Sequence, residues 1–200
     1  IKPNGHRSNK KWNPFYNLTS ESIIFVMAKR KIILVPDEIL KKKSEKIEKI
    51  TNKEKQLADD LFETMYKNNG IGLAAVQVGV LRRMIVIDVS KKDEEKKPLC
   101  LINPVIKSFG KGRSTYEEGC LSIPETFIEI ERPKTCIVEY VDISGNKTNM
   151  ECDDLLSTCI QHEINHLDGK LIIDFLSKLK KDILIKKLSK NKNTSSRVIV

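Results

Sequence analysis

Hydrophobic residues recur at helical spacing over residues 51–70, where Leu57, Leu61 and Met65 fall on one face. Thr51 and Glu54 have the spacing of a capping box at the start of this stretch, and Gly70 is a typical residue to close it. The pattern predicts an amphipathic helix whose Leu and Met side chains face a core.

Two further helices are predicted downstream. The first covers about residues 153–167. The second covers about residues 175–188 and is amphipathic, and its inward face is expected to carry Leu176, Leu179, Ile183 and Leu184.

Short runs rich in β-branched and aromatic residues predict strands at about residues 84–89, 100–107, 127–131 and 135–142. Residues 144–146 (Ser-Gly-Asn) form a turn signal that leads into another strand. Because strands and helices do not alternate strictly, the order of elements indicates the α+β class.

Length and composition limit the organisation of the chain. Its 200 residues, 40% of them hydrophobic, suffice for one buried domain with tails. The net charge of +9 is uneven: residues 1–53 carry 13 basic and 5 acidic side chains, residues 176–200 carry 8 and 1, and residues 54–175 carry 15 and 21. A nucleic-acid binder is expected to have a basic stripe on its folded surface, so no nucleic-acid specificity is predicted.

The five cysteines are odd in number and irregularly spaced, which favours a reducing compartment over a disulfide-linked secreted fold. Cys100, Cys136 and Cys152 are interpreted as small buried hydrophobic residues. No apolar run approaches the ~20 residues that a membrane-spanning helix needs, and the run at residues 22–28 is too short.

Candidate chemistry is concentrated at residues 161–169, which read QHEINHLDG. His162 and His166 are four residues apart, so on a helix both imidazoles project from one face and can reach the same ion. Glu163 lies about 100° around the helix from His162, close enough to reach a metal-activated water. This HExxH pattern predicts hydrolysis at a metal site, the alternative being a chance match on a surface helix.

An open catalytic metal site usually has three protein ligands, and the third is not supplied downstream. The chain has no Glu from residue 164 onward, and Asp168 is too close to His166 to bend back onto the same ion. Upstream, Cys120 lies in the sequence Glu-Gly-Cys-Leu-Ser-Ile-Pro, where a thiolate can be presented from a strand end toward a facing helix. Cys120 is therefore the candidate third ligand.

A third segment, residues 70–79, reads GIGLAAVQVG. Its glycines allow the backbone to approach a ligand closely. It lacks the Lys-Ser/Thr of a phosphate-binding loop, which argues against a nucleotide.

These three segments in this order resemble the peptide deformylase family, which carries a GxGLAAxQ loop, an EGCLS turn and an HExxH helix. The resemblance covers about residues 29–188. It implies the deformylase fold: an α+β fold with mixed, mainly antiparallel sheets around a central, metal-binding HExxH helix. The domain organisation expected is a leader-derived extension at 1–28, the catalytic domain at 29–188 and a flexible basic tail at 189–200.

The resemblance also implies the activity, which is removal of the N-formyl group from the initiator methionine of new proteins, with release of formate. It assigns Cys120, His162 and His166 to one divalent metal, most often Fe(II) in this family, with Ni, Co or Zn as alternatives. Ligand chemistry alone would favour Zn. Glu163 is expected to take a proton from the attacking water and pass it to the departing amine. The side chain of Gln77 and the backbone N–H of Leu121 are expected to stabilise the oxyanion.

Substrate selectivity is expected to depend on the methionine beside the formyl group. Helical spacing places Leu155, Thr158 and Cys159 on the turns before His162 as walls of an apolar pocket. Ile71 is a further wall, and the backbone of Gly72 is expected to hold the substrate peptide in an extended pose. The expected partners are formyl-methionyl nascent peptides and the ribosome where they emerge, with no membrane.

Two departures from the family pattern stand out. Asn165 stands where most members have Asp before the second His, which is expected to alter a hydrogen bond beside the metal. Residues 35–38 (Val-Pro-Asp-Glu) lack a second Pro.

The basic, Asn- and Ser-containing first 31 residues resemble an organellar transit peptide. The expected location is therefore an organelle stroma, a plastid or apicoplast before a mitochondrion, with the bacterial cytoplasm as the alternative.

Two other functions stay open at this point. One is an HExxH metallo-endopeptidase with Asp182 as third ligand. The other is a structural metal site in a basic, ribosome-associated protein. Structural sites are closed by four protein ligands, and here no fourth ligand stands out and Glu163 and Gln77 would have no role.

Overall fold

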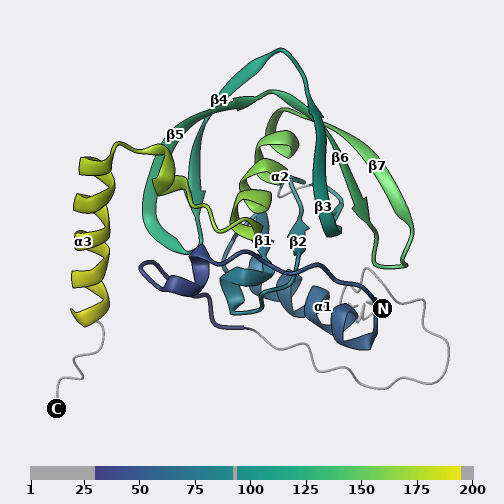
Figure 1. The fold of residues 1–200 in the computed structure, drawn as a ribbon, viewed down its shortest axis with the longest axis horizontal. Coiled ribbons are helices and arrows are strands. Elements are labelled where there is room, and N and C mark those ends of the chain that lie inside the picture. The colour runs from purple at the N-terminus through teal and green to yellow at the C-terminus, as the bar shows by residue number, and fades with distance from the viewer. Residues whose placement is uncertain (1–29, 92–93, 195–200) are drawn as a thin grey trace, which may run out of the picture.

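The computed structural model describes residues 30–91 and 94–194 (Figure 1). Helix α1 (Asn52–Lys67) begins at Thr51, and Thr51 and Glu54 form the predicted capping box. The helix ends three residues before Gly70, because Asn68 caps it and Asn69 takes a left-handed conformation with φ 55°. The N–H of Gly70 still bonds to the carbonyl of Met65, at 2.9 Å, so this glycine closes the turn that follows the helix.

A five-stranded antiparallel sheet forms the body of the molecule, with the strand order β1-β2-β3-β6-β7. Its strands are β1 (Gly72–Ala74), β2 (Met84–Ile87), β3 (Leu99–Phe109), β6 (Thr135–Val141) and β7 (Lys147–Asp153). The turn at residues 142–146 joins β6 to β7, as predicted. Helices and an antiparallel sheet in one unit confirm the α+β prediction.

Both faces of this sheet are covered by helices. Alternate residues of β2 pack against different helices. Met84 and Val86 pack in a cluster with α1, whereas Ile85 and Ile87 pack in a second cluster with helix α2 (Asp154–Leu167). Because successive strand residues point to opposite faces, a strand buried on both sides must be hydrophobic at every position. The sequence Met-Ile-Val-Ile of β2 meets this requirement.

A second sheet consists of two long antiparallel strands, β4 (Arg113–Cys120) and β5 (Ile123–Pro133). The prediction missed β4 and gave only the middle of β5. Most of β4 is polar and exposed or half-exposed, with Glu118 as its one buried residue, so it lacks the hydrophobic run that marks a strand. Cys120 is the last residue of β4 and is therefore presented from a strand end.

Helix α3 (Lys178–Thr194) lies beside β5 at the edge of the molecule (Figure 1). Leu184, Ile185 and Leu188 pack against a third cluster that includes Ile128 and Ile130 of β5. The prediction that Leu179 and Ile183 face inward is wrong, since they are 72% and 59% exposed.

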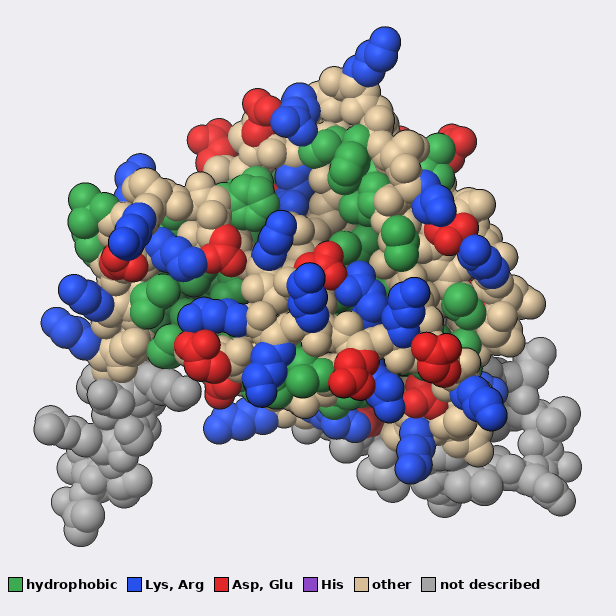
Figure 2. All heavy atoms as spheres, viewed as in Figure 1, with side chains coloured by type: hydrophobic (Ala, Val, Ile, Leu, Met, Phe, Trp, Pro, Cys, Tyr) green, Lys and Arg blue, Asp and Glu red, His purple; other side chains and the backbone are tan. Residues whose placement is uncertain are grey.

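Three short 3-10 helices complete the described elements: η1 (Glu38–Lys41), η2 (Ala75–Val78) and η3 (Ile172–Phe175). Among the described residues, no helix is both long and apolar enough to cross a membrane. On the face drawn in Figure 2, Lys and Arg side chains are interspersed with Asp and Glu, so this face carries no uniform basic stripe.

Candidate metal-dependent active site

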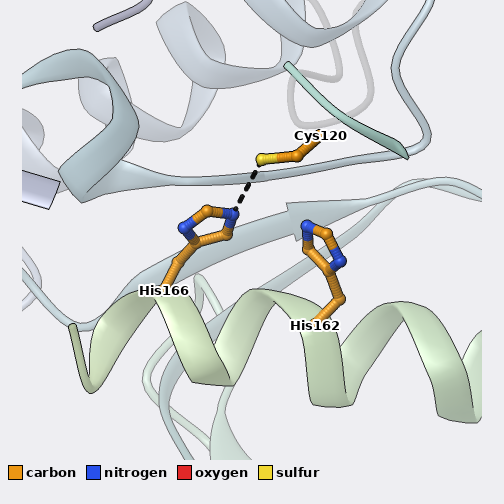
Figure 3. Close-up of side chains that lie close together, drawn as sticks. All are labelled: Cys120, His162 and His166. Atoms are coloured by element: carbon orange, nitrogen blue, oxygen red, sulfur yellow. Dashed lines mark hydrogen bonds between the residues drawn. The ribbon is translucent and has the colours of Figure 1, made fainter. Parts of the chain in front are cut away.

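The three proposed ligands converge from two elements. His162 and His166 project from one face of α2 toward the sulfur of Cys120, which lies above the helix at the end of β4 (Figure 3). One donor atom from each residue lies within 4.8 Å of the other two. The Sγ of Cys120 lies 3.3 Å from Nε2 of His166. The geometry thus collects a thiol and two imidazoles around one point.

Glu118 orients the first imidazole. Its Oε2 accepts a hydrogen bond of 2.8 Å from Nδ1 of His162, which leaves Nε2 of that ring for the ligand cluster. Sequence reasoning gave Glu118 no role, although it stands two residues before Cys120 in the same strand. Alternation places residues 118 and 120 on one face of β4, which was the available signal.

Arg132 fixes Glu118 in turn. Its Nε and Nη2 donate to the two carboxylate oxygens at 2.5 and 3.0 Å, and Nη1 donates to Oδ1 of Asn165 at 2.8 Å. Burial alone would raise the pKa of Glu118, but the hydrogen bonds from His162 and Arg132 outweigh it and hold that pKa below its ordinary value. Sequence reasoning missed Arg132, although its position after Ile128 and Ile130 at intervals of two marks the buried face of β5.

Glu163 is buried on α2, and its Oε2 makes no hydrogen bond to another side chain or backbone group. Burial raises its pKa to about 7, against the lowering effect of His162. A carboxyl group with a pKa near neutrality can both accept and donate a proton at physiological pH, as general acid–base catalysis requires.

Gln77 lies in η2, and its side-chain amide is held at both ends. Its Oε1 accepts from the N–H of Ala74 at 2.8 Å, and its Nε2 lies 3.1 Å from Oγ of Ser122 and 3.7 Å from Sγ of Cys120. The amide oxygen is therefore occupied, and the NH2 group faces the side of Cys120.

A cavity of about 630 Å³ opens over these groups. Ten residues named from the sequence or its resemblance line it: Ile71, Gly72, Gln77, Cys120, Leu121, Leu155, Thr158, Cys159, His162 and Glu163. Of the predicted site residues only His166, which is 1% exposed, does not line it.

Gly72 is required sterically at this site. A Cβ at this position would lie 2.4 Å from Oε1 of Glu163 and 2.8 Å from Sγ of Cys159. Any larger residue would therefore displace the carboxylate or the cavity wall.

The donor set fits a divalent metal of the kind that hydrolases use. A thiolate with two imidazoles gives three protein ligands and leaves a fourth position for water, as in catalytic rather than structural sites. In the described part of the chain, these three residues form the one group of such donors that lie close enough together, and Asp182 is not among them. Asp168 instead pairs with Arg83 at 2.7 Å.

A buried carboxylate beside a three-ligand donor set, at the floor of an open cavity, defines the class of metal-dependent hydrolases.

Comparison with known proteins identifies the family within this class. The polypeptide deformylase family model matches residues 29–182. The chain is 51% identical over 176 residues to a peptide deformylase of Bartonella henselae, covering 86% of this chain and all of that protein. It is 51% identical over 174 residues to one of Pelagibacter ubique, covering 87% of this chain and all of that protein.

A solved structure agrees with these relatives. The peptide deformylase of Ehrlichia chaffeensis in complex with actinonin superimposes with a TM-score of 0.79 at 41% identity, covering 82% of this chain and 98% of that one. The chain belongs to the polypeptide deformylase family and has its mixed α+β fold with antiparallel sheets. It is therefore a metal-dependent enzyme whose reaction is removal of the N-formyl group from nascent peptides.

Proposed function

We propose that this chain removes the formyl group from the amino-terminal methionine of newly made proteins and releases formate, with Cys120, His162 and His166 holding one divalent metal. The observation that carries the proposal is the convergence of these three donors within 4.8 Å beside the buried carboxyl group of Glu163. On this proposal α2 is the metal-binding helix of the fold, and the strand β4 brings both Cys120 and Glu118 to it.

A divalent metal held by Cys120, His162 and His166 would supply Lewis-acid chemistry, which lowers the pKa of water toward neutrality. We propose Fe(II) as the native metal, on the strength of the family resemblance, whereas Ni, Co and Zn suit the same donors. Metal analysis of protein purified without air tests this assignment. Stoichiometric zinc with no iron would contradict it.

Glu163 takes the proton of the attacking water and returns it to the amine as the C–N bond breaks. Its buried position and its pKa of about 7 suit it to both steps. The side-chain amide of Gln77 is fixed by Ala74 at Oε1 and by Ser122 at Nε2. Its NH2 group and the backbone N–H of Leu121 donate to the oxyanion that develops on the formyl oxygen.

The methionine side chain is proposed to enter the apolar part of the cavity. Cys159 and Thr158 form its buried wall, while Ile71 and Leu155, 42% and 39% exposed, stand at its mouth. Gly72 lies on the edge strand β1, where an extended peptide can add as a further strand and place its first carbonyl beside Glu163.

One assay separates this function from the two alternatives. Release of formate from a formyl-methionyl peptide, with no cleavage of internal peptide bonds, is expected. Cys120→Ala should abolish both the activity and stoichiometric metal, whereas Asp182→Asn should retain them. If the chain were an endopeptidase with Asp182 as ligand, Asp182→Asn would lose activity and metal and Cys120→Ala would retain them. If the metal site were structural, the unmutated protein would release no formate.

The bacterial cytoplasm is the location that we propose. The relatives from Bartonella henselae and Pelagibacter ubique, each 51% identical to this chain, are bacterial, which supports this alternative over the organelle. The transit-peptide prediction falls on residues that lie outside the described part of the chain, apart from Arg30 and Lys31. Residues 29–188 are proposed as the catalytic domain, and contact of the basic ends with the ribosome stays part of the proposal.

A further inference from the structure

Cys136 and Cys152 lie directly opposite each other on the neighbouring strands β6 and β7. Both side chains are buried, at 3% and 2% exposure, and both are reduced. Residues directly opposite in an antiparallel pair have Cα atoms about 4.5–5.5 Å apart. A disulfide bridges Cα separations of about 4.4–6.8 Å, so this position in the sheet is suited to one.

The pair is reached from the surface through a pocket that is separate from the active site. This second pocket has a volume of about 620 Å³ and is lined by both cysteines together with Ser108, Thr135 and Glu151. It shares no lining residue with the catalytic cavity. A small oxidant can therefore reach these thiols without passing the metal site.

The two thiols differ from the remaining buried cysteines in their surroundings. Cys136 lies beside Cys152 and Ser157, and these neighbours lower its pKa, whereas Cys136 raises the pKa of Cys152. The Sγ of Cys152 donates to the carbonyl of Met150 at 3.6 Å, and Oγ of Ser157 donates to the carbonyl of Pro133 at 3.3 Å. Cys100 has no such partner, and burial raises its pKa to about 12. Cys136 is thus the thiol that more readily gives the thiolate, the form that attacks oxidants, and Cys152 lies directly opposite it in the sheet.

We propose that Cys136 and Cys152 form a dithiol modification site that hydrogen peroxide converts to an intrachain disulfide. The sulfur of Cys136 attacks one peroxide oxygen, the O–O bond breaks, and a sulfenic acid and water result. Cys152 then attacks that sulfur, the S–O bond breaks, and a second water leaves. Two thiols have lost two electrons and two protons, and one peroxide has become two waters.

The position of the pair connects it to the catalytic helix without involving a ligand. Cys152 stands two residues before Asp154, where α2 begins, and Ser157 in the first turns of α2 contacts Cys136. A disulfide here would join β6 to β7 at the start of the helix that carries His162 and His166. Because Cys120 lies in the other sheet, metal content is expected to be unchanged by this oxidation.

Peptide mapping of the full-length, nickel-loaded protein tests the proposal. The protein is treated with hydrogen peroxide, alkylated without reductant and digested with trypsin. Cleavage after Lys134, Lys147 and Lys170 separates residues 135–147, which contain only Cys136, from residues 148–170, which contain Cys152 and Cys159. We expect a disulfide-linked pair of these peptides that dithiothreitol separates, with fragmentation placing the link at Cys152, and titratable thiols falling from five to three.

Cys100→Ser is the matched control, because Cys100 is buried in the same sheet and stands outside the pair. It should still form the linked peptides, whereas Cys136→Ser and Cys152→Ser should not. The unmutated protein decides the matter even if a serine variant does not fold. A link from Cys136 to Cys159 would overturn the proposal. So would a loss of thiols that gives no linked peptide and sulfinic acid at Cys120 alone.

Discussion

Nη1 of Arg132 donates a hydrogen bond of 2.8 Å to the side-chain oxygen of Asn165, the residue before the ligand His166. The same guanidinium holds Glu118, which in turn receives Nδ1 of His162. One buried arginine therefore links two turns of α2, the turn of His162 and the turn of Asn165, to the strand β4 that carries Cys120. A neutral amide at residue 165 leaves Glu118 as the one carboxylate that the described structure shows bonded to Arg132.

Glu118→Gln is expected to weaken metal binding by about 10–100-fold, as losses of such supporting partners typically do. The amide has no negative charge, and its NH2 group replaces one of the two oxygens that accept from Arg132 and His162. The imidazole therefore loses its fixed orientation and part of its basicity. Competition with a chelator of known affinity measures the effect. Glu129→Gln is the matched control, since Glu129 is exposed on β5, and it should leave the affinity unchanged. Equal affinities for all three proteins would remove Glu118 from this role.

Glu163→Gln is expected to keep the metal and to lower kcat by about 10²–10⁴-fold, the usual contribution of a positioned acid–base group. The amide preserves the shape of the carboxylate in the tight space beside Gly72 but cannot carry a proton. Metal content and formate release are measured on the same preparation. Glu163→Asp, which keeps a carboxyl group, should recover part of the rate. Residual activity of Glu163→Gln within about tenfold of the parent would show that another group acts as the base.

Gln77→Leu is expected to lower kcat by about 10²–10³-fold with little change in KM, because an oxyanion donor acts in the transition state. The amide oxygen also accepts from Ala74, so the variant could shift the loop instead. Ser122→Ala separates the two effects, since it removes a partner of Nε2 and leaves the amide in place. It should cost less activity than Gln77→Leu. A rise in KM at constant kcat would make Gln77 a substrate-binding residue.

The catalytic motifs were predictable because their chemistry depends on local spacing. Two imidazoles four residues apart share a helix face whatever the helix packs against. Cys120 was a candidate because no third ligand stands downstream of the helix, and only the resemblance assigned it to the metal, since no local rule relates residues more than 40 positions apart. The role of Gln77 likewise came from the resemblance and stays a prediction, and its partner Ser122 was given no role because that contact also joins distant segments.

The supporting residues were harder to predict because they are polar groups buried in pairs. Arginine is a residue type that is usually found at the surface. Only the alternation of buried and exposed positions along β5 indicates that Arg132 is buried. A buried arginine is tolerated because Glu118 and Asn165 satisfy its donors, and that depends on three elements meeting. The strand β4 was missed for a related reason, since its pairing with β5 and not hydrophobicity defines it. The prediction of which residues of α3 face inward was partly wrong, because the helix packs against the molecule through Leu184, Ile185 and Leu188 on one side only.

The last prediction concerns Asp59, a buried carboxyl group on α1 that has no part in the site. Burial, together with the neighbouring Asp60, raises its pKa from 3.8 to about 6. The folded protein therefore holds this proton more tightly than the unfolded chain does. The stability contributed by the neutral form is fully present below about pH 3.8 and is lost as the pH rises through 6.

Asp59→Asn should for this reason stabilise the protein at neutral pH, because the amide keeps the shape of the neutral acid and cannot ionise. A full shift of this size corresponds to about 3 kcal/mol, which partial solvent screening reduces to about 1–2 kcal/mol of unfolding free energy at pH 7. Denaturant unfolding of the metal-loaded proteins at pH 7 and pH 4 measures it, and most of the gain should be lost at pH 4. Asp60→Asn is the matched control: Asp60 pairs with Arg30 at 2.9 Å, so losing its charge should destabilise the fold at pH 7. If Asp59→Asn lowered the free energy of unfolding equally at both pH values, ionisation of Asp59 would not destabilise the folded protein. The raised pKa of Asp59 would then be wrong.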